Sequence, residues 1–155
     1  MGSAGLRVGV FVEGGLPVRA RSFARVVGSV LHHPRGWRQA GYAFRIVASQ
    51  PADMSIVLAS PALTDSLCAP LLTLGHYSCA HAGRAVLNFE RWVKGAPAYA
   101  SIARYRTYMI NHEVGHLLGR GHVVCTTPGA LAPLMVQQTK GVAPCLPNPW
   151  PLPGE

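Results

Sequence analysis

The sequence predicts an α+β fold, in which a mixed, twisted sheet of about four to five strands packs against two main helices. Three observations support this class. Valine-rich segments with alternating apolar residues stand on both sides of one amphipathic helical segment. A second helical segment follows the last strand, and the end of the chain is too rich in proline for a helix or a central strand. This order differs from the regular alternation of strands and helices that builds a doubly wound parallel sheet.

The first part of the chain supplies a strand, a helix and two more strands. Leu6–Glu13 alternates and is rich in valine, which predicts a strand. Val18–His33 carries apolar residues at spacings of three and four and is followed by Pro34, which predicts an amphipathic helix that ends there. Tyr42–Ala48 and Asp53–Ser60 have the character of the second and third strands.

The second part of the chain supplies a loop, a strand and a long helix. Pro61–Ser78 is rich in turn residues and is predicted to be a loop. Arg84–Trp92 has an alternating character that predicts a fourth strand. Ser101–Leu118 contains no proline and fits a helix of about five turns. We expect this helix to end at Gly119, because glycine accepts the left-handed conformation that terminates helices. An irregular tail follows.

The composition favours a single folded domain over the 155 residues. Apolar residues make up 49% of the chain, so disorder is not expected. No stretch approaches the roughly eighteen consecutive apolar residues of a transmembrane helix. Met1–Ser3 resemble residues added for recombinant expression. The start of the chain lacks the pattern of a signal peptide, so an export signal removed before Ala4 stays an open expectation.

The formal net charge of +8 predicts a basic surface. Such a surface favours anionic surroundings, for example the polymers or lipid head groups of a cell envelope. The 14 lysine and arginine residues are spread along the chain without a basic run or an aromatic-basic RNA motif, so we expect no nucleic-acid partner. A solvated basic surface without a specific partner is the alternative. We expect the protein to be a monomer.

The four cysteines allow three disulfide pairings, and none shows the CxxC spacing of zinc ribbons or thioredoxin-like proteins. Pairing of neighbours closes two short loops and leaves no free thiol; these pairs are Cys68 with Cys79 and Cys125 with Cys145. Disulfides of this kind indicate a secreted protein or one in the extracytoplasmic cell envelope. Four buried free thiols in a cytosolic protein are the alternative.

The segment "NHEVGHLLGRGH" gathers three histidines around one glutamate. His112 and His116 are four residues apart, so on a helix they project from one face and can bind the same Zn²⁺ ion. Glu113 follows the first of these residues and can act as a general base and acid. His122 reaches the same ion only if the helix stops and the chain turns back after Gly119. Unrelated surface histidines and a zinc site without catalysis are the alternatives.

The stretch "HEVGHLLGRGH" resembles HExxHxxGxxH, the signature of the metzincin metallopeptidases. That resemblance implies a metzincin-like fold, one catalytic zinc ion and a methionine-containing turn beneath the metal, for which Met135 in "APLMVQQ" is the candidate. Other segments are similar to a short domain of unknown function in bacterial secreted and cell-envelope proteins; they are "PRGW", "LCAPL", "VLNFERW", "GAPAY" and "QQTKG" with the later "PNPWP".

The resemblance implies a zinc-dependent endopeptidase, in which Glu113 assists the attack of a zinc-bound water on a protein or peptide substrate. Metzincin substrates extend along an edge strand before the active-site helix, and Arg84–Phe89 is the matching segment. A side-chain pocket is expected beside the Met-turn, where Gln137 replaces a tyrosine of some members and, like Gln138, could donate to the oxyanion. The candidate substrate-binding residues are therefore Arg84, Val86, Asn88, Leu134, Val136 and Gln137.

Two other functions remain compatible with the sequence. The first is a zinc amidase that acts on cell-wall peptides, which suits a basic protein of the cell envelope. The second is a non-catalytic binding module with structural zinc. Structural sites are closed by four protein ligands, whereas catalytic sites keep one position open. The motif supplies three ligands, and this favours an enzyme.

Overall fold

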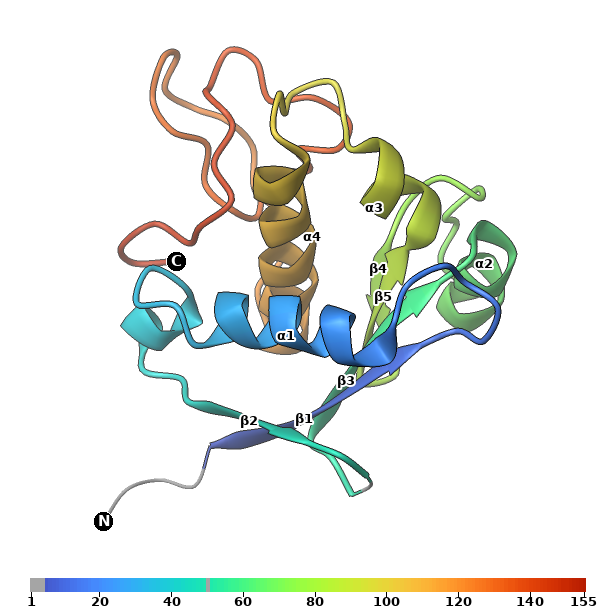
Figure 1. Ribbon diagram of the computed structural model, residues 1–155. Coiled ribbons are helices and arrows are strands. Elements are labelled where there is room, and N and C mark those ends of the chain that lie inside the picture. The colour runs from blue at the N-terminus through green and yellow to red at the C-terminus, as the bar shows by residue number, and fades with distance from the viewer. Residues whose placement is uncertain (1–4, 50) are drawn as a thin grey trace.

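The computed structural model describes residues 5–49 and 51–155, so the prediction made for Met1–Ser3 lies outside the described residues. Within the described ranges the chain forms a five-stranded sheet, four α-helices and one short 3-10 helix, Trp37–Ala40. Figure 1 shows the sheet with two long helices against it and an irregular tail beside the second of them. A mixed sheet with two main helices is thus confirmed.

The sheet has the strand order β2-β1-β3-β5-β4. Neighbours from β2 to β5 run parallel, and β4 is antiparallel to β5. Parallel pairing therefore dominates more than the sequence led us to expect. The strands are β1 (Leu6–Val12), β2 (Phe44–Val47), β3 (Met54–Ala59), β4 (Cys79–His81) and β5 (Arg84–Asn88).

The short strand β4 corrects the expectation that Arg84–Phe89 lies at the edge of the sheet. β4 forms a hairpin with β5 through Ala82 and Gly83, both of which have positive φ. Positive φ at both central residues is typical of the tight turns that suit twisted hairpins. No sequence pattern indicated this hairpin, because β4 is too short to show alternation and alanine is unusual in such a turn. β4 is therefore the edge strand, and β5 is interior.

Two of the four helices are long. They are α1 (Ala20–Leu31) and α4 (Ile102–Leu117), and both agree with the predicted segments. α4 begins after Ser101, whose hydroxyl oxygen accepts a hydrogen bond from the backbone N–H of Arg104 at 3.2 Å. Such a cap satisfies one of the unpaired N–H groups at a helix start.

The first short helix, α2 (Pro61–Cys68), lies in the segment that was predicted to be a loop. The Ser60 side chain caps it by accepting from the backbone N–H of Leu63, and proline fits the first turn. Only Thr64 and Cys68 are fully buried on this helix. An apolar stripe this narrow is a weak helical signal beside so many turn residues, and the loop prediction was wrong for this reason.

The second short helix, α3 (Phe89–Lys94), replaces the end of the strand predicted for Arg84–Trp92. The strand stops at Asn88, whose side-chain oxygen accepts from the backbone N–H of Glu90 at 2.9 Å. Asparagine in this position favours the start of a helix over a continued strand. The helix ends at Gly95, which has a positive φ.

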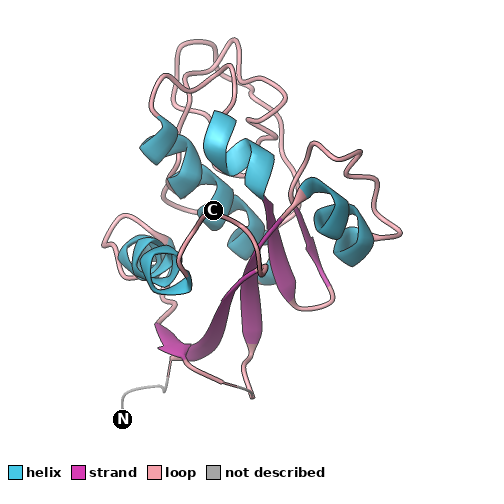
Figure 2. Ribbon diagram, turned by 45° about the vertical axis from the view of Figure 1, so that its right-hand side comes forward, coloured by secondary structure: helices cyan, strands magenta, loops and turns pink. Residues whose placement is uncertain are grey.

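The helices cover the sheet on both faces. Alternate strand residues Val8, Ile56, Leu58 and Leu87 are buried in one core with residues of α1 and α4. The residues between them, including Val57 and Val86, pack in a smaller core with α2. Figure 2 shows α2 on the side of the sheet away from α1 and α4. The larger core therefore supports α4, which carries the histidine motif.

Two disulfides connect the loops, as predicted. Cys68 at the end of α2 is bonded to Cys79 at the start of β4, and Cys125 is bonded to Cys145 within the tail. Beyond α4 the described chain is irregular, apart from isolated bridges such as Val123 with Val136. None of the helices in the described ranges has both the length and the apolar character needed to cross a membrane.

Candidate metal centre

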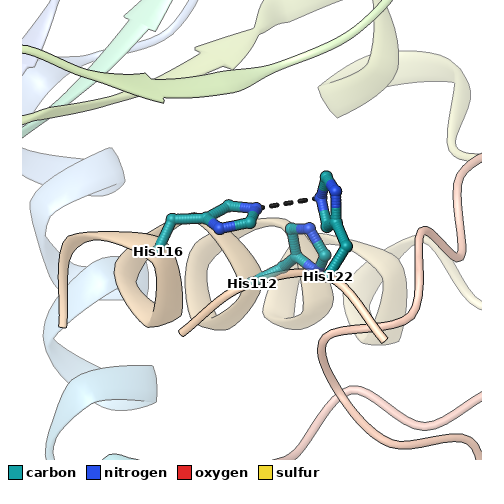
Figure 3. Close-up of side chains that lie close together, drawn as sticks. All are labelled: His112, His116 and His122. Carbon is teal, nitrogen blue, oxygen red and sulfur yellow. Dashed lines mark hydrogen bonds between the residues drawn. The ribbon is translucent and has the colours of Figure 1, made fainter. Parts of the chain in front are cut away.

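The three histidines of the motif converge at the end of α4. His112 and His116 project from one face of the helix, one turn apart (Figure 3). The helix ends at Leu117 with Leu118 as its cap, and Gly119 follows with a φ of 95°, a value that glycine adopts without strain. The chain then turns back and brings His122 to the other two, as the sequence predicted.

The facing nitrogen atoms are close enough to share one ion. One nitrogen from each of His112, His116 and His122 lies within 4.8 Å of the others. The Nε2 atoms of His116 and His122 are 3.0 Å apart (Figure 3). Two imidazoles on one tetrahedral zinc ion place their nitrogens about 3.3 Å apart, given zinc–nitrogen distances near 2.0–2.1 Å. The separation of His116 and His122 is therefore close to that of two zinc ligands, and the three histidines together lie close enough to hold a metal ion.

Backbone carbonyls orient two of the three imidazoles. His112 Nδ1 donates to the carbonyl of Leu134 at 3.0 Å, and His116 Nδ1 donates to the carbonyl of Arg120 at 2.8 Å. A ring whose Nδ1 carries the proton has its lone pair on Nε2, which is the form that binds metal. Both rings are thus held in the tautomer that a metal site needs.

The third imidazole has a side-chain partner. The carboxamide of Gln137 lies 2.8 Å from His122 Nδ1 through its Nε2 atom. A half-turn of this carboxamide would present its oxygen as an acceptor for an Nδ1–H group, the partner that a metal-bound imidazole requires. Burial, together with the charges of His116 and Lys140, lowers the pKa of His122. This lowering favours the neutral ring, which is the form that binds a metal.

Glu113 lines the same cleft as the three imidazoles. Its side chain is buried, and desolvation raises its pKa to about 8. Burial likewise lowers the pKa of His112 to about 3, which favours the neutral ring. A nearby cation would stabilise the ionised form of Glu113 and lower its pKa again. A carboxyl group tuned in this way can both accept and return a proton near neutral pH.

Met135 lies against the helix that carries the ligands. Its sulfur is 2.6 Å from the point that a Cβ atom on Gly115 would occupy, and Trp37 is 2.8 Å from the same point. Only glycine leaves room for this contact, so Met135 packs directly beneath the backbone of α4. The sequence led us to expect Met135 under the three imidazoles; the contact that the structure shows is with the backbone of α4 at Gly115, and Met135 does not line the cleft.

Glu155 supports the segment that contains Met135 through hydrogen bonds to its backbone. The carboxylate of Glu155 accepts hydrogen bonds from the backbone N–H groups of Leu134 at 2.9 Å and Met135 at 3.2 Å. Leu134 is the residue whose carbonyl holds His112. Arg120, whose carbonyl holds His116, donates from its guanidinium to the carbonyl of Glu155 at 3.2 Å. Glu155 therefore connects the supports of two ligands.

Sequence reasoning missed this brace. Glu155 is the only acidic residue after Glu113 in a chain with six, and that scarcity was the available signal. A second contact comes from Asn111, whose buried side-chain Nδ2 donates to the carbonyl of Pro149 at 2.9 Å. The tail thus holds α4 at the level of the metal site.

The histidines open into a cleft of about 420 Å³. The residues Ser78, Cys79 and Ala80, at and before the edge strand β4, line one wall. Glu113 and the three histidines line the floor. Further lining residues come from the loop before β4, from α4 and from the tail, among them Leu71, Leu72, Tyr77, Tyr105, Thr139 and Lys140.

Of the six candidate substrate-binding residues, only Gln137 lines this cleft. Val86 and Asn88 are fully buried in the interior strand β5, and Arg84 lies at its start. Leu134 and Val136 are buried, and their carbonyls accept hydrogen bonds from His112 and Tyr108. Gln138, the other candidate oxyanion donor, is buried with its amide bonded to the carbonyl of Asn148.

The comparisons with known proteins place the chain in a family without assigning an activity. The model of DUF3152, a family of proteins of unknown function, matches residues 6–145. None of the curated proteins matches the chain. The resemblance to a domain of unknown function is confirmed, and the metzincin resemblance stays a prediction. Because the match covers most of the sequence, the chain belongs to the DUF3152 family.

Proposed function

We propose that the protein is a zinc-dependent peptidase, and that its cleft binds and hydrolyses extended peptides. The observation that carries the proposal is the convergence of three oriented imidazoles in an open cleft that the buried side chain of Glu113 also lines. Three protein ligands leave one zinc position open, as catalytic sites require. A structural zinc site would need a fourth ligand, and the histidines are the only such cluster in the described ranges.

His112, His116 and His122 would hold the ion. When bound, zinc supplies Lewis-acid polarisation of the scissile carbonyl and lowers the pKa of the attacking water towards about 7. Glu113 accepts the proton that this water loses and returns it to the nitrogen of the departing amine. The dry surroundings of Glu113 favour the first transfer, because a carboxylate with a raised pKa is a stronger base.

The edge strand β4 is the best-placed element to hold a substrate. One side of β4 pairs with β5, and the other faces the cleft through Cys79 and Ala80. An extended peptide can add to such an edge through backbone hydrogen bonds. This role replaces the one first expected for Arg84–Phe89. The disulfide from Cys79 to Cys68 anchors the strand to α2, which keeps the edge in place.

A zinc amidase that acts on cell-wall peptides is the second candidate. The net charge of +8 favours it, because a basic enzyme accumulates on anionic cell-envelope polymers. The two disulfides suit an oxidising compartment, so we also propose that the protein works outside the cytoplasm.

The test is metal-dependent cleavage. Zinc-loaded protein, with and without a chelator, is incubated with a proteome-derived peptide library, casein and peptidoglycan fragments, and new termini are read by mass spectrometry. Glu113→Gln should keep one zinc per chain and lose most activity. Glu90→Gln is the matched control, since Glu90 pairs with Lys94 on α3 outside the cleft. Undiminished cleavage by Glu113→Gln would rule out the mechanism, and no cleavage of any substrate would rule out the function.

A further inference from the structure

Lys140 stands at the mouth of the metal cleft. It lines the cleft together with Gln137 and His122, and it also lines the adjoining hollow on the far side of these two residues. Its ammonium nitrogen lies 5.1 Å from the centre of the Tyr77 ring, which belongs to the loop before β4. The side chain therefore reaches from the tail to the loop before β4, and both residues of this contact line the cleft.

No carboxylate of the described residues pairs with Lys140. The ion pairs of the described chain are Arg7 with Asp53, and Arg91 and Lys94 with Glu90. The chain's other lysine, Lys94, thus has its acidic partner, whereas Lys140 has only an aromatic face. Such a contact leaves the ammonium group largely hydrated and free to meet an anion.

The cleft itself offers nothing to neutralise this charge. Glu113 is its one acidic lining residue, and that side chain is buried. The carboxylates elsewhere are engaged by other groups: Glu13 by Ser60, Asp65 by Gly75, and Glu155 by Leu134, Met135 and Leu152. A substrate would therefore have to bring the anion that pairs with Lys140.

We propose that Lys140 binds a carboxylate of the substrate, so that the preferred peptides carry an acidic group close to the bond that is cleaved. The carboxylate can belong to an Asp or Glu side chain or to the C-terminus of the peptide. In both cases it displaces Tyr77 as the partner of the ammonium group and forms a charge-assisted hydrogen bond. Lys140 is thereby a specificity residue, and the inference rests on the peptidase function proposed above.

The experiment compares two forms of one peptide library. In the first form the peptides are native, and in the second all carboxyl groups are converted to neutral amides. Zinc-loaded protein should cleave the native peptides with a kcat/KM about fivefold higher than that of the amidated ones, as a single solvent-accessible charge pair allows. Lys140→Ala should abolish this difference, Lys140→Arg should keep it, and Lys140→Glu should reverse it.

Lys94→Ala is the matched control, because it removes the same charge from an exposed position outside the cleft. It should leave the preference unchanged, and thermal unfolding should be alike for all variants. The cleavage positions identify the source of the carboxylate. An acidic residue at a fixed offset from the cut indicates a side chain, and cuts at a fixed distance from the end indicate the C-terminus.

The outcomes separate this inference from the proposed function. Equal cleavage of both libraries, or a preference that survives Lys140→Ala, would overturn the role of Lys140 and leave the peptidase intact. Cleavage of neither library would overturn both.

Discussion

The sulfur of Met135 lies 2.6 Å from the position that a Cβ atom on Gly115 would occupy. Gly115 is in the middle of the histidine motif, one residue before His116, and Met135 is in the tail. A helix interior is an unfavourable place for glycine, which costs about 0.5–1 kcal/mol relative to alanine. Here the absence of a side chain allows Met135 to approach the backbone of α4 next to His116.

Gly115→Ala should destabilise the protein in spite of the better helix propensity of alanine. The new methyl group would meet Met135 and also Trp37, 2.8 Å away, and overpacking of this kind costs about 1–3 kcal/mol. Urea unfolding of the metal-free protein measures the effect. Gly121→Ala is the control, since no atom lies within 4 Å of its added Cβ. A stability equal to or above that of the parent would show that the contact is not tight.

Glu155→Ala should weaken zinc binding without touching a ligand. The carboxylate accepts from the backbone N–H groups of Leu134, Met135 and Leu152, so its loss leaves partly buried donors unpaired, which costs up to about 1–3 kcal/mol each. Leu134 then holds His112 less firmly. We expect zinc affinity to fall several-fold, approaching the roughly tenfold loss that is typical when a hydrogen-bond partner of a metal ligand is removed. Competition with a chromogenic chelator measures it. Glu90→Ala, at a surface ion pair, should leave the affinity unchanged.

The stability of the metal-free protein should depend on pH through Glu113. Burial raises its pKa from 4.5 to about 8 in the folded state, so the folded protein binds a proton that the unfolded chain releases. Stability is then fully present below about pH 4.5 and is lost as the pH rises towards 8. The contribution of His112 to stability has the opposite sign. Its pKa is lowered to about 3 in the folded state, so this contribution is lost as the pH falls below its ordinary pKa of 6.5.

The difference in unfolding free energy between the parent and Glu113→Gln isolates the carboxyl group, because both proteins share the contribution of His112. The parent should lose stability relative to the variant across this pH range. Bound zinc should make this loss of unfolding free energy with rising pH smaller, since a cation favours the ionised carboxylate. A pH-independent difference in the metal-free proteins would show that Glu113 is not desolvated in solution.

The two disulfides should differ in their effect on zinc. Cys125 follows His122 by three residues, and its bond to Cys145 fixes that segment to the tail. Replacing both residues by serine should lower zinc affinity as well as stability. Replacing Cys68 and Cys79 should lower stability by a similar amount, about 3 kcal/mol, because the closed loops are of comparable length. Zinc affinity should then be nearly unchanged, and isothermal titration calorimetry of both double variants tests the contrast.

Local sequence signals located much of the fold and the candidate ligands. The alternation in Leu6–Glu13 and the helical spacing in Val18–His33 found β1 and α1 to within a few residues. The signals failed where elements were short. Asn88 ends a strand and begins a helix within one apolar stretch, and three-residue β4 has no period to detect. Those two errors misplaced the edge of the sheet and the wall of the cleft.

By itself the sequence determined which three histidines form the candidate metal site. Helical geometry puts His112 and His116 on one face, and a glycine at position 119 permits the turn that returns His122; each depends on residues close in the chain. Only the tertiary structure decided which strand is the free edge, that Glu155 braces the supports of the ligands, and that Lys140 faces Tyr77 across the cleft. These relationships join residues far apart in the sequence, and packing of the whole chain, which no local pattern encodes, brings them together.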